Sequence, residues 1–304
     1  MEAYDPTITT SGTEEWAVRR DEAVQNHVGT YQLIEYETRN VEWVFPSKDL
    51  IHSDLKLVFG IGSVTAGMLK NEGYETLSDL CRHPRWSRAA RELLRIIEKR
   101  DIGRLQKYGA SDLELLSFYR PEDLTFVDIE TVGLYYMYPV FLIGVLQFEE
   151  GKGVIRQFLA RNFEEEVAIL AELSESIRNQ GILVSYNGKS FDIPYLKGRL
   201  RFYQMDDRFE AFHLDLLKHA RREFKPILPN CRLTTIEKFV FKEVREGDLP
   251  GSEVPEFYQR FMDTGDRFYI DPILKHNACD LLALAKLLGI LIPGEGGKAV
   301  SCVY

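Results

Sequence analysis

The protein has 304 residues, a formal net charge of −9 at neutral pH, 45% hydrophobic residues and 28% charged residues. These fractions are ordinary for a soluble globular protein, and no apolar run reaches the roughly 18 residues of a membrane-spanning helix. The acidic total disfavours a protein that coats nucleic acid through bulk charge. The polar N-terminus is not typical of a secretory signal, so we expect a cytoplasmic protein without a membrane partner.

The cysteines give no sign of a zinc site. Cys81, Cys231, Cys279 and Cys302 are widely separated, and no C-x-x-C pair occurs. Free thiols in a reducing cytosol are the simple interpretation.

In chain order, residues 1–24 are predicted to be a polar lead-in, and residues 25–56 a small β-like segment of unknown role. Residues 57–108 form the first segment with a recognisable pattern, and residues 109–121 are a connector. Residues 122–292 alternate between strand and helix patterns, and the Gly-rich residues 293–304 form a flexible tail.

The first recognisable pattern is a glycine turn between short helices. Gly60 and Gly62 flank the turn, a helix pattern starts at Ser63, and Gly73 can end it. Thr76 can cap a second helix. The segment resembles a helix-hairpin-helix module.

Such a module implies contact with a nucleic-acid backbone. Gly60 and Gly62 would let the backbone approach a phosphate, and amides at the start of the next helix would face the anion. Residues 82–107 follow with nine Lys or Arg and three acids. The alternatives are that the hairpin packs on a neighbouring domain or a protein partner, and that the basic stretch is a solvated helix face.

Residues 122–292 read strand, strand, strand, helix, strand, helix. The strands are expected at 124–131, 139–148, 154–159 and 182–186, and Asn162 can cap a helix to about residue 179. This order favours an α/β fold with a mixed sheet flanked by helices.

Acidic residues occur at the ends of these elements. Asp128 and Glu130 alternate along a strand and therefore share a face. Asp192 is near the start of a helix. His276 and Asp280 are four residues apart on a largely apolar helix, where both need a partner. Taken singly, these are also consistent with an exposed strand end, a helix-dipole contact and a satisfied core histidine.

Taken together, the carboxylates predict a metal site. Four acids in one place raise each other's pKa and resist burial. Mg²⁺ or Mn²⁺ prefers such oxygen ligands, and two ions can clamp the attacking and leaving oxygens of a phosphodiester.

The order D-x-E, N-x-x-x-[FY]-D and H-x-x-x-D resembles the DEDD exonuclease superfamily. These motifs are Asp128 to Glu130, Asn187 to Asp192 and His276 to Asp280. Stretches such as SYNGKSFDIPYLKGRL and HNACDLLAL make the YprB-like RNase H-like nucleases the most similar group. The resemblance implies an RNase H-like fold with a five-stranded mixed sheet, preceded by the small helical hairpin domain.

The resemblance also implies a mechanism. A nucleic acid would be hydrolysed from its 3′ end to nucleoside monophosphates. Asp128, Glu130, Asp192 and Asp280 would hold two divalent ions, Mg²⁺ or Mn²⁺, and His276 would be the general base. His276 departs from the family pattern, in which His commonly has four intervening residues before the last Asp, or Tyr has three.

Several neighbours of the acids are candidates for nucleic-acid contact. Thr131 and Asn187 belong to this set, and Asn187 could also orient a metal ligand or water. Leu134 and Tyr135 could stack on the terminal base, but core packing is the favoured interpretation for both. Asp215 is expected to be a structural hydrogen-bond acceptor, and residues 246–251 with Tyr258 to border the cleft.

The leading interpretation is a metal-dependent 3′→5′ exonuclease acting on single-stranded DNA. An RNA exonuclease that trims 3′ ends is an alternative, because only a contact to the 2′-hydroxyl separates the two. A structure-specific endonuclease and a non-catalytic adaptor are further alternatives. The acidic total charge predicts weak binding alone, with delivery by a helicase or other repair or replication protein.

Overall fold

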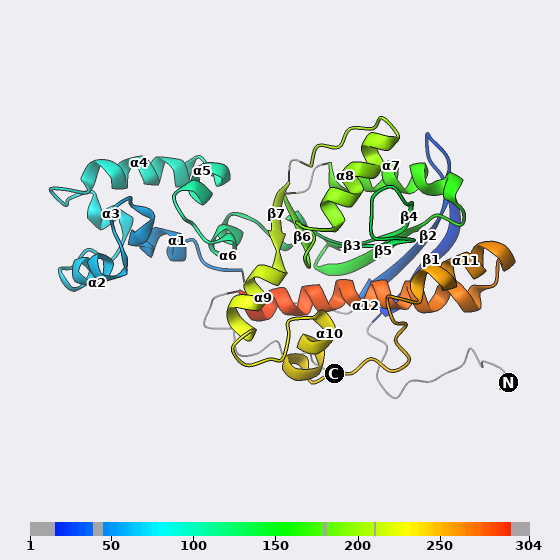
Figure 1. The fold of residues 1–304 in the computed structure, drawn as a ribbon. Helices are drawn as coiled ribbons and strands as arrows, with labels where there is room; N and C mark the ends of the chain where they lie inside the picture. Colours follow the sequence, from blue (N-terminus) through cyan, green and yellow to red (C-terminus); the bar gives the residue numbers. More distant parts are fainter. Residues whose placement is uncertain (1–15, 39–44, 179–180, 210, 293–304) are drawn as a thin grey trace. The chain divides into compact units, whose positions relative to one another are not determined.

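The structure, a computed structural model, describes residues 16–38, 45–178, 181–209 and 211–292. The chain divides into two compact units, which are described separately (Figure 1). Among the described residues, the first contains residues 16–38, 124–178, 181–209 and 211–286, and the second contains residues 45–123 and 287–292.

A seven-stranded mixed sheet forms the centre of the first unit, in the order β1-β2-β5-β4-β3-β6-β7. The strands are β1 (Trp16–Gln25), β2 (Thr30–Thr38), β3 (Leu124–Thr131), β4 (Val140–Glu149), β5 (Lys152–Leu159), β6 (Ile182–Ser185) and β7 (Phe212–Asp215). Neighbours from β1 to β3 pair antiparallel, whereas β3–β6 and β6–β7 are parallel. The predicted mixed α/β fold is confirmed.

The two strands beyond the expected five come from the N-terminal hairpin. Residues 16–25 were expected to belong mostly to a polar lead-in, and residues 30–38 to a segment of unknown role. Instead β2 pairs with β5 from Gln32↔Leu159 to Thr38↔Gly153. The partner strand lies more than 100 residues away in sequence, so no local pattern could reveal the pairing.

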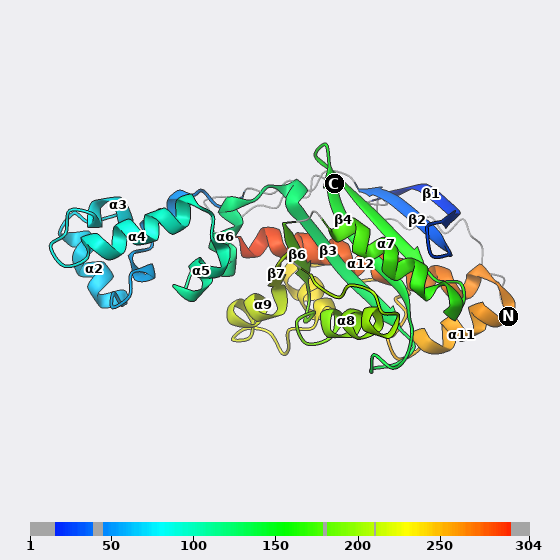
Figure 2. The ribbon, with the colours of Figure 1, turned by 90° about the horizontal axis from the view of Figure 1, so that it is seen from above.

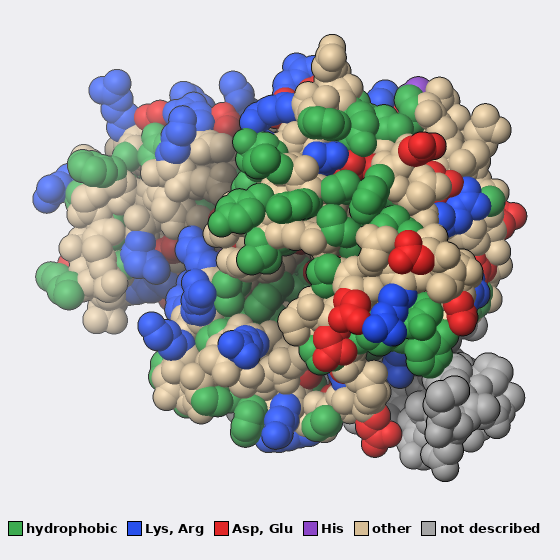
Figure 3. Space-filling model, turned by 45° about the vertical axis from the view of Figure 1, so that its right-hand side comes forward, with side chains coloured by type: hydrophobic (Ala, Val, Ile, Leu, Met, Phe, Trp, Pro, Cys, Tyr) green, Lys and Arg blue, Asp and Glu red, His purple; other side chains and the backbone are tan. Residues whose placement is uncertain are grey.

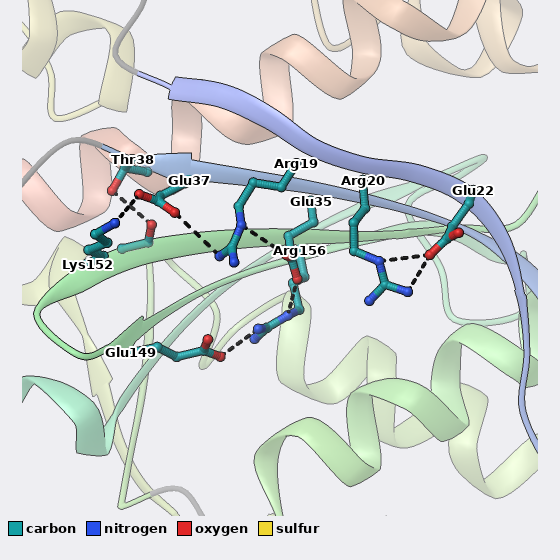
Figure 4. Close-up of polar contacts among 10 residues, drawn as sticks. Arg19, Arg20, Glu22, Glu35, Glu37, Thr38, Glu149, Lys152 and Arg156 are labelled. Carbon is teal, nitrogen blue, oxygen red and sulfur yellow. Dashed lines mark hydrogen bonds and ion pairs between the residues drawn. The ribbon is translucent and has the colours of Figure 1, made fainter.

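Charged side chains cross the hairpin and its neighbour β5 (Figure 4). Arg156 Nε lies 2.8 Å from a Glu35 oxygen, and Lys152 Nζ lies 2.7 Å from a Glu37 oxygen. Arg19 lies within 4 Å of both glutamates. Opposite charges on adjacent strands stabilise a particular register, so these pairs help fix β1 and β2 on the sheet.

Helices cover both faces of the sheet (Figures 1 and 2). They are α7 (Glu166–Ile177), α8 (Asp192–Phe202), α9 (Leu216–Phe224), α10 (Leu233–Ile236), α11 (Val254–Thr264) and α12 (Arg267–Leu291), with the short helical turns η4 (Phe163–Glu165) and η5 (Glu237–Phe241). Gln147 on β4 donates to the Ser176 carbonyl of α7, and Gln157 on β5 donates to the Leu274 carbonyl of α12. The two helices therefore lie against opposite faces.

A buried ion pair joins α7 to α8. Arg199 donates from Nε to Glu166 Oε1 at 2.7 Å and from a terminal nitrogen to Oε2 at 2.5 Å. The Tyr203 hydroxyl and the Val140 amide also donate to Glu166. Because a buried charge is costly unless paired and hydrogen-bonded, this network holds α7, α8 and the start of β4 in one arrangement.

The second unit is helical in its described residues. It contains α1 (Asp49–Ser53), η1 (Leu55–Leu57), α2 (Ser63–Asn71), α3 (Leu77–Leu80), α4 (Ser87–Glu98), α5 (Ile102–Lys107), α6 (Asp112–Leu115), η2 (Leu116–Phe118) and η3 (Pro121–Asp123). The expected connector, 109–121, thus holds short helical turns packed in this unit.

The predicted glycine turn and its two helices lie where the sequence indicated. Gly60 has φ 87° and Gly73 has φ 88°, in the left-handed region that favours glycine. Thr76 caps α3 in a capping box with Asp79. A Cβ on Gly60 would lie 3.2 Å from the Trp86 ring, so packing also favours glycine there. The nucleic-acid contact of Gly60 and Gly62 stays a prediction.

Candidate active site

The acids of β3 face α12. Thr125 accepts a hydrogen bond from Gln147, which also reaches α7. Asp128 accepts one from Asn277 Nδ2 of α12, at 2.8 Å to Oδ2. Since side chains alternate along a strand, Asp128 and Glu130 both lie on the α12 side of the sheet.

Asn277 ties Asp128 to the sheet and to α12. Its side chain is fully buried. Its amide nitrogen also donates to the Asp128 carbonyl at 3.2 Å, and its Oδ1 accepts from Gln157 Nε2 at 2.8 Å. This network fixes one oxygen of Asp128.

Gly144 of β4 pairs with Asp128 across the sheet and lets α12 come close. A Cβ at Gly144 would lie 2.0 Å from Asn277 Oδ1. No side chain fits in that space, so glycine is required for α12 to bring its polar residues to β3.

Asp192 is placed by the turn before α8. Asn187 has φ 67°, and its amide donates to Asp215 Oδ1 at 2.9 Å. The Lys189 amide donates to Asp215 Oδ2 at 3.1 Å. Asp215 is therefore the structural acceptor that the sequence indicated. A hydrogen bond from the Ile129 amide to Asp192 brings the start of α8 to β3.

His276 and Asp280 share a face of α12, as predicted. His276 Nε2 lies 3.8 Å from Asp280 Oδ2. The other ring nitrogen, Nδ1, lies 2.7 Å from Asp248 Oδ1. Asp248 lies in the loop 246–251 that was expected to border the cleft, and this contact places it beside the candidate base.

Arg245 pairs with the last acid. Its terminal nitrogen donates to Asp280 Oδ1 at 2.5 Å, and its Nε donates to Glu237 at 3.0 Å. Its side chain is 11% exposed. Sequence reasoning missed Arg245 and Asn277 as site residues, and it included Asp248 only as part of the loop 246–251. Asn277 had a signal, as a polar residue between His276 and Asp280 on an apolar helix.

Burial and mutual repulsion change the acidity of the carboxyl groups. Burial first, and then Asp280, Glu130 and Asp192, raise the pKa of Asp128 well above its usual value. Burial raises the pKa of Glu130 to about 8, although His276 opposes the shift, and burial raises the pKa of Asp192 to about 7. The four predicted acids and His276 therefore lie close enough to influence one another's charge.

The pKa of His276 is also raised. Burial lowers this pKa, but Asp280, the hydrogen bond to Asp248 and the charge of Glu130 together outweigh burial. A neighbouring carboxylate favours the protonated imidazole.

The carboxylates have the ligand chemistry that a divalent metal prefers, but their present positions suit a metal less well. Asp128, Glu130 and Asp192 are oxygen donors of the kind that divalent metals prefer, and the charges of Glu130 and Asp192 raise the pKa of Asp128. Among the residues that the structure describes, however, no three His, Cys, Asp or Glu side chains already form a metal-binding group. Asp280 turns instead to Arg245. The oxygen donors therefore suit a divalent metal in kind, while Asp280 is held by Arg245.

The residues predicted to contact nucleic acid or to border the cleft differ in their exposure and in their partners. Leu134 is 79% exposed and Tyr135 is 71% exposed, so core packing, the favoured interpretation for both, is wrong. Thr131 donates from Oγ1 to the Gly133 carbonyl at 2.8 Å. Tyr258 is fully buried and stacks on Phe141, with ring centroids 3.7 Å apart.

Residues 125–292 match the family model of the RNase_H superfamily, and the chain belongs to this family. Within the described residues, no helix is long and apolar enough to cross a membrane.

Two curated relatives are similar to this chain. The uncharacterized protein YprB of Bacillus subtilis is 33% identical over 175 residues, covering 56% of this chain and 42% of YprB. The uncharacterized protein MJ0365 of Methanocaldococcus jannaschii is 26% identical over 172 residues, covering 55% of this chain and 93% of that protein. The chain thus spans less than half the length of YprB.

Two solved structures are also similar in part. The family B DNA polymerase from the archaeon Pyrobaculum calidifontis has 18% identity and a TM-score of 0.44, covering 55% of this chain and 24% of the polymerase. E. coli Exonuclease I, in complex with a dA16 oligonucleotide, has 14% identity and a TM-score of 0.33, covering 53% of this chain and 45% of that chain.

Proposed function

We propose that the protein is a metal-dependent 3′→5′ exonuclease that hydrolyses single-stranded nucleic acid, DNA in preference to RNA, to nucleoside monophosphates. The observation that carries the proposal is the group of half-buried Asp128 and Glu130 and buried Asp192 beside a histidine that is itself oriented by an aspartate. Membership of the RNase_H superfamily supports a nuclease.

Asp128, Glu130, Asp192 and Asp280 would hold two divalent ions, Mg²⁺ or Mn²⁺. When bound, such ions activate water and stabilise the charge on the leaving oxygen. The role of the surrounding residues would be to hold the carboxylates in position. Asn277 orients Asp128, and the Asp215-bound turn orients Asp192.

His276 is the candidate general base. Its Nδ1 is engaged by Asp248, which leaves Nε2 on the side of Asp280. A neutral imidazole whose Nδ1–H donates to a carboxylate has its Nε2 lone pair free to accept a proton from water. Asp248 would then stabilise the imidazolium that forms.

Arg245 would act as the counter-charge of Asp280 while no metal is bound. Its guanidinium neutralises an acid that would otherwise face three others. Metal entry then requires Asp280 to exchange the guanidinium for an ion. We further propose a cytoplasmic protein that a helicase or other repair or replication protein delivers to its substrate, because the net charge of −9 disfavours tight binding alone.

The test uses single-stranded DNA and RNA of one sequence, labelled at the 5′ end, with Mn²⁺, Mg²⁺ or EDTA. We expect a ladder that shortens from the 3′ end only with metal, and faster cleavage of DNA. Faster cleavage of RNA would instead support the 3′-trimming alternative, and internal cuts would support an endonuclease.

A matched pair of variants controls this experiment. Asp280→Asn should abolish cleavage, whereas Asp271→Asn on the same helix should not, because Asp271 makes an exposed ion pair with Arg267. Equal binding with and without EDTA, and no cleavage of either strand, would reject the exonuclease in favour of a non-catalytic adaptor.

A further inference from the structure

A groove of about 780 Å³ lies beside the elements that carry the acids. Its lining consists of two residues of the segment after β3 and six of α8: Tyr136, Met137, Pro194, Lys197, Gly198, Arg199, Arg201 and Phe202. The segment follows β3, which carries Asp128 and Glu130, and α8 begins at Asp192. Both walls therefore belong to segments of the chain that follow directly after candidate site residues.

The walls expose large hydrophobic side chains. Met137 is 80% exposed, Phe202 is 66% exposed and Tyr136 is 58% exposed. Figure 3 shows that hydrophobic side chains gather on one face of the molecule, with Lys and Arg side chains beside them. Contiguous exposed apolar surface is uncommon unless it binds something.

The backbone beneath these side chains is held in place. Arg199 donates to the Tyr136 carbonyl at 3.2 Å and to the Met137 carbonyl at 3.4 Å. The Tyr195 hydroxyl donates to the carbonyls of Gly133 at 3.1 Å and Tyr138 at 2.9 Å. The aromatic side chains are thus presented by a fixed segment, which lowers the entropy lost on binding.

The Tyr136 ring lies directly against α8 at Gly198. A Cβ on Gly198 would lie 2.5 Å from the first ring carbon of Tyr136. Glycine at this position therefore sets the distance between the two walls.

The charge of the groove is opposite to that of the chain as a whole. Its lining contains Lys197, Arg199 and Arg201 and no acid, whereas the net charge of the chain is −9. Arg199 is occupied by its buried ion pair with Glu166. Arg201 makes an exposed ion pair with Asp207, and a phosphate can replace Asp207 at small cost in free energy. Lys197 lies over the Phe209 ring and is half-buried.

Aromatic faces with adjacent cations suit a single nucleic-acid strand, whose bases stack and whose phosphates are anionic. An acidic peptide would pair with the cations but would gain less binding free energy from contact with the aromatic ring faces. Along α8, at about 1.5 Å per residue, Phe202 lies roughly 15 Å beyond Asp192.

We propose that this groove binds the nucleotides that precede the 3′-terminal one while that terminal nucleotide occupies the acidic site. The proposal rests on the exonuclease function and adds to it a subsite for the single strand, formed by Tyr136, Met137, Lys197 and Phe202.

The experiment measures binding of 5′-labelled single-stranded oligonucleotides of two to ten nucleotides by fluorescence anisotropy in EDTA, and cleavage of the same strands with Mn²⁺. For the wild type, affinity should rise with length over the first several nucleotides. Phe202→Ala and Tyr136→Ala should each weaken binding of the ten-nucleotide strand by about tenfold and remove part of the gain with length. Lys197→Gln should lower the slope of log K against log salt by about one.

Matched controls are Phe268→Ala, which removes an aromatic ring that is 50% exposed on α12, and Lys218→Gln on the exposed side of α9. Both should bind as the wild type does. Dinucleotide cleavage should change little in Phe202→Ala, because its single preceding nucleotide does not extend to Phe202, roughly 15 Å beyond Asp192 along α8.

Failure of the groove proposal can be distinguished from failure of the exonuclease proposal. If the wild type cleaves and binds the strands but the groove variants match the controls at every length, the groove proposal is wrong and the exonuclease stands. If the wild type neither binds nor cleaves any strand, both are wrong. Tighter binding of an acidic peptide than of the oligonucleotides, lost in Phe202→Ala, would assign the groove to a protein partner and overturn the proposal.

Discussion

The carboxylate of Asp248 lies 2.7 Å from Nδ1 of His276 and connects a loop to the helix that carries the HNACD motif. The connection spans 28 residues of sequence. It fixes the imidazole ring and defines which nitrogen is available to the site. A histidine whose spacing departs from the pattern of similar proteins thus has a structural partner that supports its role.

Asp248→Asn should lower kcat by about tenfold to a hundredfold, by analogy with the loss of other groups that orient a catalytic or ligating histidine. KM and metal affinity should change little, because Asp248 is not expected to contact the substrate. Single-turnover cleavage with saturating Mn²⁺ measures kcat. Asp263→Asn on α11 is the matched control. A rise in KM at constant kcat would assign Asp248 to substrate binding instead.

Metal should stabilise the protein more at pH 8 than at pH 6. The pKa of Glu130 is raised from 4.5 to about 8, and that of Asp192 from 3.8 to about 7. At pH 6 these groups are mostly protonated, and bound metal must displace their protons.

The same pKa shifts predict how the stability of the metal-free protein changes with pH. Acids with raised pKa values bind more protons in the folded state, so their contribution to stability is lost as pH rises from about 4 to 8. We expect Tm in EDTA to fall between pH 6 and pH 8, and the gain in Tm on adding Mn²⁺ to grow over this range. Glu130→Gln should reduce both trends. A gain independent of pH would contradict a metal held by these acids.

Gly144→Ala should destabilise the fold by about 1–3 kcal/mol, the usual cost of forcing extra atoms into a packed core. The added Cβ would overlap Asn277 Oδ1, so α12 or the side chain must move. Urea denaturation measures the free energy of unfolding. Gly251→Ala is the control, because no atom lies within 4 Å of the Cβ it would gain, and its effect should stay within about 0.5 kcal/mol. Equal effects of both changes would show that α12 tolerates the overlap.

Arg245→Gln should destabilise the metal-free protein by about 3 kcal/mol, because it leaves Glu237 and Asp280 without their cation. Mn²⁺ should restore more stability to this variant than to the wild type, since Asp280 no longer exchanges a guanidinium for the metal. Denaturation with and without Mn²⁺ gives both quantities. Arg260→Gln removes an exposed ion pair with Glu256 and a contact with the Tyr269 ring, both away from the acids, and is the control. If Mn²⁺ restored less stability to this variant than to the wild type, Arg245 would instead assist metal binding.

Much of the sheet domain followed from local patterns. The apolar runs of β3, β4 and β6 predicted buried strands, and the cap at Asn162 predicted the start of the helical segment before α7. The hairpin of β1 and β2 was not predicted as part of the sheet, because a strand at one end of the chain does not reveal its partner at 152–159.

The sequence by itself determined which residue types could bind a metal, since the three spaced motifs name Asp128, Glu130, Asp192, Asp280 and His276. Only the tertiary structure decided what surrounds them. Gly144, Asn277, and the pair Arg245 and Asp248 lie on three different parts of the chain, and each acts through a contact across more than 25 residues of sequence. Periodicity and spacing report on neighbours within a few residues, whereas burial, pairing and orientation arise only when distant segments pack together.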